Sequence, residues 1–279
     1  SVLLMKKTLL LTALAALSWQ AAHADDYGLW LDMAAQKNFS KKLSASIEAD
    51  LRGENQLRDF TRASIGLGMD YKPTKWFSLG VGYSFIADYN LSETKVWIGK
   101  NSGKFKGYKV DDAYWRNKHR ATVDVTGSLP LGRFTLSLRE RYQYTHFVAT
   151  TTDRTEYSGE ITNPNGFTGE KYAFNDKYFS SMERTDDRKG AKDRHYLRSR
   201  IGVEYNIRHC NWTPYATYEF SNDLSNGLHL DKQRLTVGTE LKVGKQHRFD
   251  FAYVYTHGMD DDNGNDNLHV LSIGYKFKF

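Results

Sequence analysis

Arginines and carboxylates at alternating positions are the residues of this sequence that could do chemistry. Two arginines stand two residues apart at Arg139 and Arg141, and again at Arg198 and Arg200. Side chains two apart on an extended strand share one face, so each pair would present two guanidinium groups to the same space. The predicted charge network is Glu48, Arg52, Arg62, Arg120, Arg139, Arg141, Arg198, Arg200, Glu204, Glu219, Arg234 and Glu240.

This charge network has two interpretations. Opposite charges can pair across a narrow interior and fill it, because each buried charge needs a partner. Alternatively, basic residues outnumber acidic ones on the charged face, which would favour passage of anions. The inner wall of two neighbouring strands is almost bare at Gly66, Gly68, Gly80 and Gly82, so the arginines opposite, a gap or the N-terminal segment must lie against it.

A third interpretation is an outer-membrane enzyme that modifies lipids. Such an enzyme needs a nucleophilic serine within hydrogen-bond reach of a base. No His-x-Ser occurs, and His269 and Ser272 point to opposite faces of one strand. We therefore assign no catalytic residue and regard this interpretation as the weakest of the three.

The acidic run 260–266 is the one stretch that suggests a metal site. Placing it in the register of an EF-hand puts Met259 at the first ligand position and Val270 at the last, and neither side chain can bind calcium. We expect no metal site and no cofactor. The run is interpreted as a solvated loop, with divalent-cation bridging to lipopolysaccharide as the alternative.

The N-terminus has the pattern of an export signal. Lys6 and Lys7 precede the apolar run 9–17, and Ala22-His23-Ala24 supplies the small residues that signal peptidase requires. We predict a start at Met5, a cleaved signal peptide within residues 1–24 and a single domain over 25–279. Cys210 is the only cysteine, so an internal disulfide is excluded.

The rest of the chain alternates between apolar and polar residues, although its mean hydropathy of −0.63 resembles that of a soluble protein. Strict alternation indicates strands with one apolar face. In the clearest example, Leu43, Ile47 and Leu51 alternate with polar residues. The segments that share this pattern are 43–52, 63–71, 77–85, 121–129, 134–144, 197–205, 212–220, 235–243, 249–255 and 267–279.

The connections between these segments alternate in length. Short ones at 72–75, 130–133, 206–211 and 244–246 alternate with longer ones at 53–60, 87–114, 148–193, 221–232 and 258–266. Aromatic residues collect at both ends of the strands, as in membrane girdles. The sequence therefore predicts an all-β fold, a closed antiparallel transmembrane β-barrel of ten to twelve strands with short periplasmic turns and long extracellular loops.

The segment from Tyr27 to Gln36 also alternates and would make eleven strands. Bacterial barrels usually have an even number of strands. Ten strands from Leu43 onward satisfy this rule, with residues 25–37 as an element in the lumen or at the rim. Twelve would require one further strand, and both numbers stay open within the predicted range. Glu140 interrupts an apolar face, which we interpret as a bulge or a position near the headgroups.

The closing segment carries Tyr275, Phe277 and Phe279 on one face. This ending resembles the last strand of outer-membrane barrels, which the barrel-assembly machinery reads as an insertion signal. We therefore expect the bilayer, lipopolysaccharide and that machinery as partners, and no nucleic acid.

Several short motifs resemble a family of uncharacterised Gram-negative outer-membrane β-barrels, domain of unknown function 2490. They include Gly28-Leu29-Trp30, Gly80-x-Gly82-Tyr83, His119-Arg120, Leu138-Arg139-x-Arg141, Leu197-Arg198-x-Arg200, Arg234-Leu235 with Gly238-x-Glu240, and Gly274-Tyr275. The resemblance implies a barrel in the bacterial outer membrane and carries no activity. We expect a charge-plugged structural barrel, or one that binds an unidentified extracellular or periplasmic partner, with a small anion-preferring pore as the alternative.

Overall fold

The computed structural model describes residues 26–100, 102–258 and 267–279. The predicted signal peptide, its cleavage site and the acidic run 260–266 lie outside these residues. In the described part of the chain, no helix is long and apolar enough to cross a membrane.

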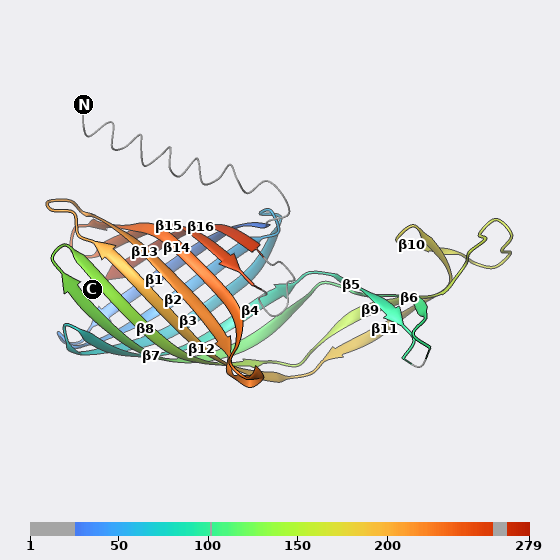
Figure 1. Cartoon of the computed structure of the whole chain (residues 1–279), viewed down its shortest axis with the longest axis horizontal. Helices are drawn as coiled ribbons and strands as arrows, with labels where there is room; N and C mark the ends of the chain where they lie inside the picture. The colour runs from blue at the N-terminus through green and yellow to red at the C-terminus, as the bar shows by residue number, and fades with distance from the viewer. Residues whose placement is uncertain (1–25, 101, 259–266) are drawn as a thin grey trace, which may run out of the picture.

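Within the described residues, eleven strands close into one barrel (Figure 1). Around the barrel they follow the order β1, β16, β15, β14, β13, β12, β8, β7, β4, β3 and β2. Their bounds are β1 Asp26–Asn38, β2 Leu43–Glu54, β3 Asp59–Thr74, β4 Phe77–Asn90, β7 Tyr114–Leu131, β8 Phe134–Phe147, β12 Lys192–Tyr205, β13 Trp212–Asp223, β14 His229–Val243, β15 His247–His257 and β16 Asn267–Lys278.

All ten segments predicted from alternation are strands of this barrel. Their apolar side chains point outward and stay exposed, as at Ile47 (55%) and Leu67 (59%). The glycines and charged residues of the alternate positions line the interior. The predicted all-β barrel and its inward and outward faces are therefore confirmed.

The prediction for the N-terminal segment is wrong. β1 is a strand of the wall, paired antiparallel with β2 and parallel with β16. The parallel register runs from Asp26 opposite Leu268 to Gln36 opposite Lys278. Because β1 pairs with both neighbours, the described barrel closes with eleven strands, which lies within the predicted range of ten to twelve although an even number was expected.

The two ends of the barrel differ. We call them the turn end, where short turns join the strands, and the sheet end, where a second sheet is attached; this second sheet is called the extension. At the turn end, two-residue connections at 75–76 and 132–133 join neighbouring strands. At the sheet end, the predicted long loops 87–114 and 148–193 are mostly strands of a second sheet, which projects beyond the barrel (Figure 1). Its order is β10, β11, β9, β6 and β5, with bounds β5 Glu93–Ile98, β6 Phe105–Asp111, β9 Thr150–Glu160, β10 Tyr172–Phe174 and β11 Lys177–Lys189. A short 3-10 helix, η1, spans Leu224–Asn226 at the same end.

An aromatic cluster holds this extension together. Phe179 on β11 is fully buried and packs edge-on against Tyr108 on β6, with ring centroids 5.9 Å apart. Phe174 stacks on Tyr157 at 4.5 Å. The extension thus has a small core of its own, separate from the barrel interior.

Candidate functional site in the barrel lumen

Glu219 is the centre of the ion pairs inside the barrel. Its Oε2 atom accepts hydrogen bonds from Arg139 at 2.7 Å and from Arg200 at 2.8 Å. Its Oε1 atom accepts from both Nε and Nη2 of Arg198, the former at 3.1 Å. Strands β8, β12 and β13 place these four side chains in adjacent register positions, and Glu219 is only 4% exposed. One carboxylate therefore ties together three arginines of neighbouring strands. We call this cluster, which contributes residues to both of the cavities described below, the Glu219 partition.

Two further pairs extend the network along the wall. Arg141 binds Asp124 with two hydrogen bonds, at 2.5 and 2.7 Å. Arg62 binds Asp88 through two nitrogens, and Lys118 Nζ lies 2.6 Å from the same carboxylate. Two-point pairing of this kind fixes guanidinium orientation as well as charge, so these side chains are held in place.

Trp30 joins β1 to the charge network. The guanidinium carbon of Arg52 lies 4.1 Å from the ring centroid of Trp30, and that of Arg234 lies 4.9 Å away. The indole nitrogen donates to Glu54 at 3.2 Å. Both arginines gain cation–π attraction from the same buried ring. These contacts link β1, which carries Trp30, to β2 and β14 inside the barrel.

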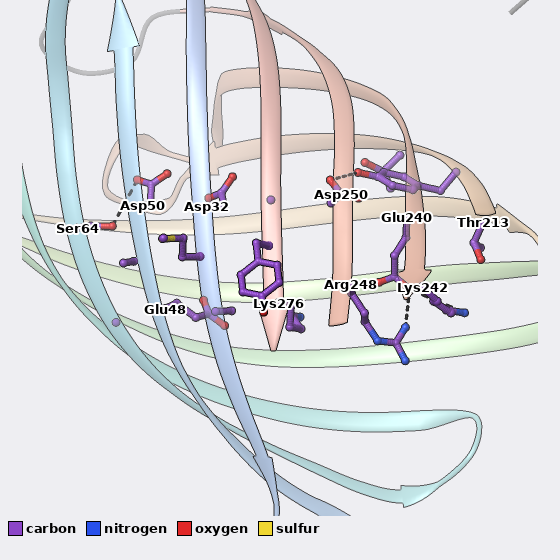
Figure 2. Close-up of a pocket in the computed structure, with 18 of the residues that line it drawn as sticks. Asp32, Glu48, Asp50, Ser64, Thr213, Glu240, Lys242, Arg248, Asp250 and Lys276 are labelled. Atoms are coloured by element: carbon purple, nitrogen blue, oxygen red, sulfur yellow. Dashed lines mark hydrogen bonds and ion pairs between the residues drawn. The ribbon is translucent and has the colours of Figure 1, made fainter. Parts of the chain in front are cut away.

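A cavity of about 660 Å³ occupies the turn-end half of the lumen. Its wall carries four carboxylates at successive register positions on neighbouring strands, and Figure 2 labels them: Asp50, Asp32, Asp250 and Glu240. Asp50 is opposite Asp32, and Asp250 is opposite Glu240. Gly274 lies between the two pairs, opposite both Asp32 and Asp250.

Two further acids of the predicted network, Glu48 and Glu204, line the same cavity. Arg248 donates a hydrogen bond to Glu240 at 2.5 Å. Tyr215 donates to Asp250 at 2.9 Å. Carboxylates therefore dominate the wall near the short turns.

One part of the glycine wall, at Gly66, faces this cavity. Gly66 lines it together with Ser64 and Ser84. A gap therefore lies against the wall at Gly66, and the N-terminal segment does not, because β1 is part of the barrel wall.

A second, smaller chamber of about 90 Å³ lies on the other side of the Glu219 partition. Arg52, Arg62, Arg120, Arg198 and Arg234 from the predicted network line it, together with Lys118 and Lys232. The carboxylates among its lining residues are Glu219 and Asp231. The lumen is thus polarised, with carboxylates prominent toward the short turns and cations dominant toward the extension.

Trp30, Asp32 and Asp88 are among the lumen residues that the predicted network omitted. Trp30 and Asp32 lie on β1, which was not expected in the wall. Asp88 lies on β4 beyond the predicted strand end at Phe85. Its parity with Ser84 was the signal that could have identified it, because alternate residues of one strand share a face.

The outer face carries one unusual polar pair. Glu140 on β8 points outward and accepts a hydrogen bond from Ser199 on β12 at 2.6 Å. Neither β7–β8 nor β8–β12 shows a register shift at this position. Of the two interpretations of Glu140, the bulge is therefore wrong, and Glu140 is an outward-facing carboxylate in a regular strand. Its position near the headgroups stays a prediction.

Histidines on the same outer face pair with tyrosines. The hydroxyl of Tyr83 lies 2.7 Å from Nδ1 of His119, and that of Tyr142 lies 2.7 Å from Nδ1 of His195. His247 and Tyr275 form a similar pair at 2.9 Å. Tyr275 is also part of the predicted closing signal, whose Phe277 and Phe279 rings lie 5.6 Å apart at the turn end. These contacts give the outer histidines hydrogen-bonding roles within the wall.

A compact ion cluster braces the base of the extension. Asp111 on β6 is buried and pairs with Arg154 on β9 at 2.5 and 3.0 Å and with Lys189 on β11 at 2.7 Å. Burial alone would raise the pKa of Asp111, but the hydrogen bonds and charges of Arg154 and Lys189 outweigh it and hold this pKa well below its usual range. Asp111 therefore stays ionised and links three strands.

Within the described residues, no group of three or more histidine, cysteine or acidic side chains is placed to hold a metal ion. The lumen arrangement can instead hold charges in fixed positions, divide the interior and bind a solute of complementary charge.

Comparison with known proteins places the chain in a family. A search of curated proteins found no match. A family model described as "Protein of unknown function (DUF2490)" matches residues 27–267, which include the described barrel strands β2 to β15 and the extension. The chain belongs to this family of proteins of unknown function.

Proposed function

We propose that this protein is an integral barrel of the bacterial outer membrane with a charge-plugged lumen. The observation that carries the proposal is the outward apolar surface, which stays exposed on strands around the barrel while the charges lie inside. Leu138 and Ile201 are more than half exposed, as are Ile47 and Leu67. Exposed apolar area costs roughly 25 cal/mol per Å² in water, and a bilayer removes this cost.

The aromatic residues support the same orientation. Outward-facing Tyr83, Trp115 and Tyr142 lie toward the extension. Trp76, Phe134 and Trp212 lie near the short turns. Girdles at both interfaces are typical of outer-membrane barrels. By analogy, the turn end would face the periplasm and the extension would face the outside.

The Glu219 partition supports a plug in place of an open pore. Its three arginines come from β8 and β12, and all of them contact one carboxylate. These side chains are largely buried, and displacing them from their ion pairs to widen the lumen would cost several kcal/mol for a buried pair. The barrel would therefore act as a support, and the extension would present the surface that binds a partner.

The extension has the exposed apolar side chains that partner binding needs. Val96 and Ile98 on β5 and Tyr178 and Met182 on β11 are all more than 40% exposed. Apolar side chains gathered on a projecting element are common at protein interfaces. An extracellular or cell-surface partner is the role that we propose for the extension.

A small anion-preferring pore is the second candidate, and the cation-lined chamber is the observation that favours it. In that case the partition would have to open. The two candidates differ in a simple measurement, since only the pore passes a steady current.

A matched pair of substitutions tests the membrane proposal. Val123 and Leu57 are both exposed apolar residues, but Val123 is mid-strand on the outer face and Leu57 lies in a connection at the sheet end. Val123→Arg should destabilise the folded barrel in bilayers by about 2–4 kcal/mol, whereas Leu57→Arg should change stability by less than about 0.5 kcal/mol. Equal, mild effects of both, together with recovery of the protein in the soluble fraction, would refute the proposal.

A further inference from the structure

The extension ends on an open sheet edge at β5. Among the described residues, β5 pairs with β6 on one side and with no strand on the other. The backbone N–H and C=O groups along such an edge can pair with another extended chain. The opposite edge strand, β10, has only three residues and offers few such groups. The extension projects beyond the barrel (Figure 1), so β5 is the edge that can accept a further strand.

A row of apolar side chains crosses the extension and stops at this edge. Met182 on β11 lies opposite Tyr157 on β9. Tyr108 on β6 lies opposite Tyr157 on one side and opposite Val96 of β5 on the other. Directly opposite residues share one face of a sheet. Tyr108 is only 8% exposed, whereas Val96 is 58% exposed, because Val96 lacks the neighbouring strand that covers Tyr108.

The sequence of β5, ETKVWI, can pair antiparallel with a second copy of itself. In a two-fold pair of identical strands, one residue lies opposite its own copy. Centres at Lys95 and Val96 give the longest overlap, which spans residues 93–97 or 94–98. The first centre places two ammonium groups directly opposite each other, which is destabilising. The Val96 centre is therefore the favoured one.

The register centred on Val96 suits both faces of the sheet. On the apolar face, Val96 meets Val96 of the second copy and Thr94 meets Ile98, so the apolar row continues from one copy into the other. This contact covers the exposed side chains of Val96 and Ile98. On the opposite face, Lys95 meets Trp97 of the second copy, and a lysine beside an indole ring gains cation–π attraction.

We propose that two copies of this protein associate through their β5 strands, which pair antiparallel about a two-fold axis at Val96. Roughly four to six backbone hydrogen bonds would form between the copies. The two extensions would then become one continuous sheet. The inference rests on the proposed function in one respect, because it names a second copy of the chain as the partner of the extension.

The test uses the whole protein in a non-ionic detergent, with Cys210→Ser to remove the exposed free cysteine. A cysteine in place of Val96 would lie opposite its own copy, so mild oxidation of Val96→Cys should give a crosslinked dimer. Met182→Cys is the matched control, because Met182 is exposed at the far end of the same row. Its dimer yield should be roughly tenfold lower, since distant cysteines cannot form a disulfide.

Two further variants test the register. Thr94 and Ile98 lie opposite each other across the two copies, whereas each lies about 14 Å along the strand from its own counterpart. A mixture of Thr94→Cys and Ile98→Cys proteins should therefore crosslink. Either variant alone should crosslink roughly tenfold less.

Sedimentation in density-matched detergent measures the same association without crosslinking. Val96→Arg would place two guanidinium groups opposite each other and should weaken dimerisation roughly tenfold or more. Met182→Arg adds the same charge three strand spacings, or about 14 Å, from the edge. It should change dimerisation less than about twofold, because salt screens charges at that separation.

A wild-type protein that stays monomeric would overturn the inference. A dimer that Val96→Arg does not weaken, or a cysteine mixture that crosslinks no better than its components, would overturn it as well. Neither result bears on the barrel, because a monomer that inserts into bilayers without conducting keeps the plug and leaves the extension to a different partner. A dimer that conducts would refute the plug and keep the β5 interface.

Discussion

Ser199 donates a hydrogen bond to Glu140 at 2.6 Å on the outer face of the barrel. The neighbouring outward residues on the two strands, Leu138 and Ile201, are exposed and apolar. In the proposed orientation this pair therefore faces lipid. A carboxylate at a lipid-facing position is costly, and the serine hydroxyl offsets part of that cost.

Replacing this pair with apolar residues should stabilise the barrel. Glu140→Leu combined with Ser199→Ala removes the carboxylate and its donor together, so no hydroxyl is left without its acceptor. We expect a gain of about 1–2 kcal/mol in urea unfolding from lipid vesicles, with Ile201→Leu as a near-neutral control. If the double variant instead loses stability or no longer self-associates, Glu140 and Ser199 contact another protein molecule within the membrane plane.

Removing the carboxylate of Glu219 should be among the most damaging single changes in the lumen. Glu219→Gln leaves Arg139, Arg198 and Arg200 without their shared charge, which we expect to cost roughly 3–5 kcal/mol. Glu204 is the matched control, because it is exposed to the larger cavity. Glu204→Gln should change the unfolding free energy by less than about 0.5 kcal/mol, and similar losses in both variants would argue against the partition.

Substitution of Asp111 should loosen the extension and leave the barrel intact. Asp111→Asn removes the charge that Arg154 and Lys189 share. Limited proteolysis should then cleave β6, β9 and β11 at least tenfold faster, while the heat-modifiable mobility of the barrel stays unchanged. Unchanged cleavage would show that the aromatic cluster alone holds the extension.

The same ion cluster should make the extension sensitive to acid. The pKa of Asp111 in the folded protein lies below its unfolded value of about 3.9. Its contribution to stability is therefore complete above about pH 4 and is lost as the pH falls toward the folded pKa. Hydrogen exchange of the extension, corrected for intrinsic rates, should accelerate below pH 4 in the wild type, and this acid response should be much smaller in Asp111→Asn.

A pair of cysteines can test the parallel closure of the barrel. Leu31 on β1 lies opposite Ile273 on β16, and neighbouring strands are close enough for a disulfide. In a Cys210→Ser background, Leu31→Cys with Ile273→Cys should oxidise to a crosslinked species. The offset pair Leu31→Cys with Leu271→Cys should crosslink far less, and equal yields from the two pairs would contradict the register.

Alternation predicted the barrel well where an apolar face was continuous, as in β2, where Ile47 faces outward and Glu48 lines the cavity. At β1 the alternation also indicates a strand, but the even strand number of bacterial barrels favours a place outside the wall, so the two signals conflict for that segment. The extension was missed because β9, with sequence TTTDRTEYSGE, is largely polar. Its pairing with β6 and β11 is fixed by buried residues elsewhere, such as Tyr108 and Phe179.

The lumen contacts were the least predictable part of the site. Periodicity assigned Arg139 and Glu219 to the same interior, but they are 80 residues apart in sequence and meet only because β8, β12 and β13 are adjacent. Strand order and register decide such pairs, and the sequence pattern of a single strand carries neither. The segregation of carboxylates from cations between the two cavities was hidden for the same reason.

Planar-bilayer recording on the purified wild-type barrel tests the central claim most directly. If the arginines around Glu219 close the lumen, insertion of the protein should produce no steady current at either polarity in molar potassium chloride. A porin inserted into the same membranes serves as the positive control. Steady open-channel conductance from the wild-type protein, with reversal potentials that favour anions, would contradict the plugged barrel and support the pore.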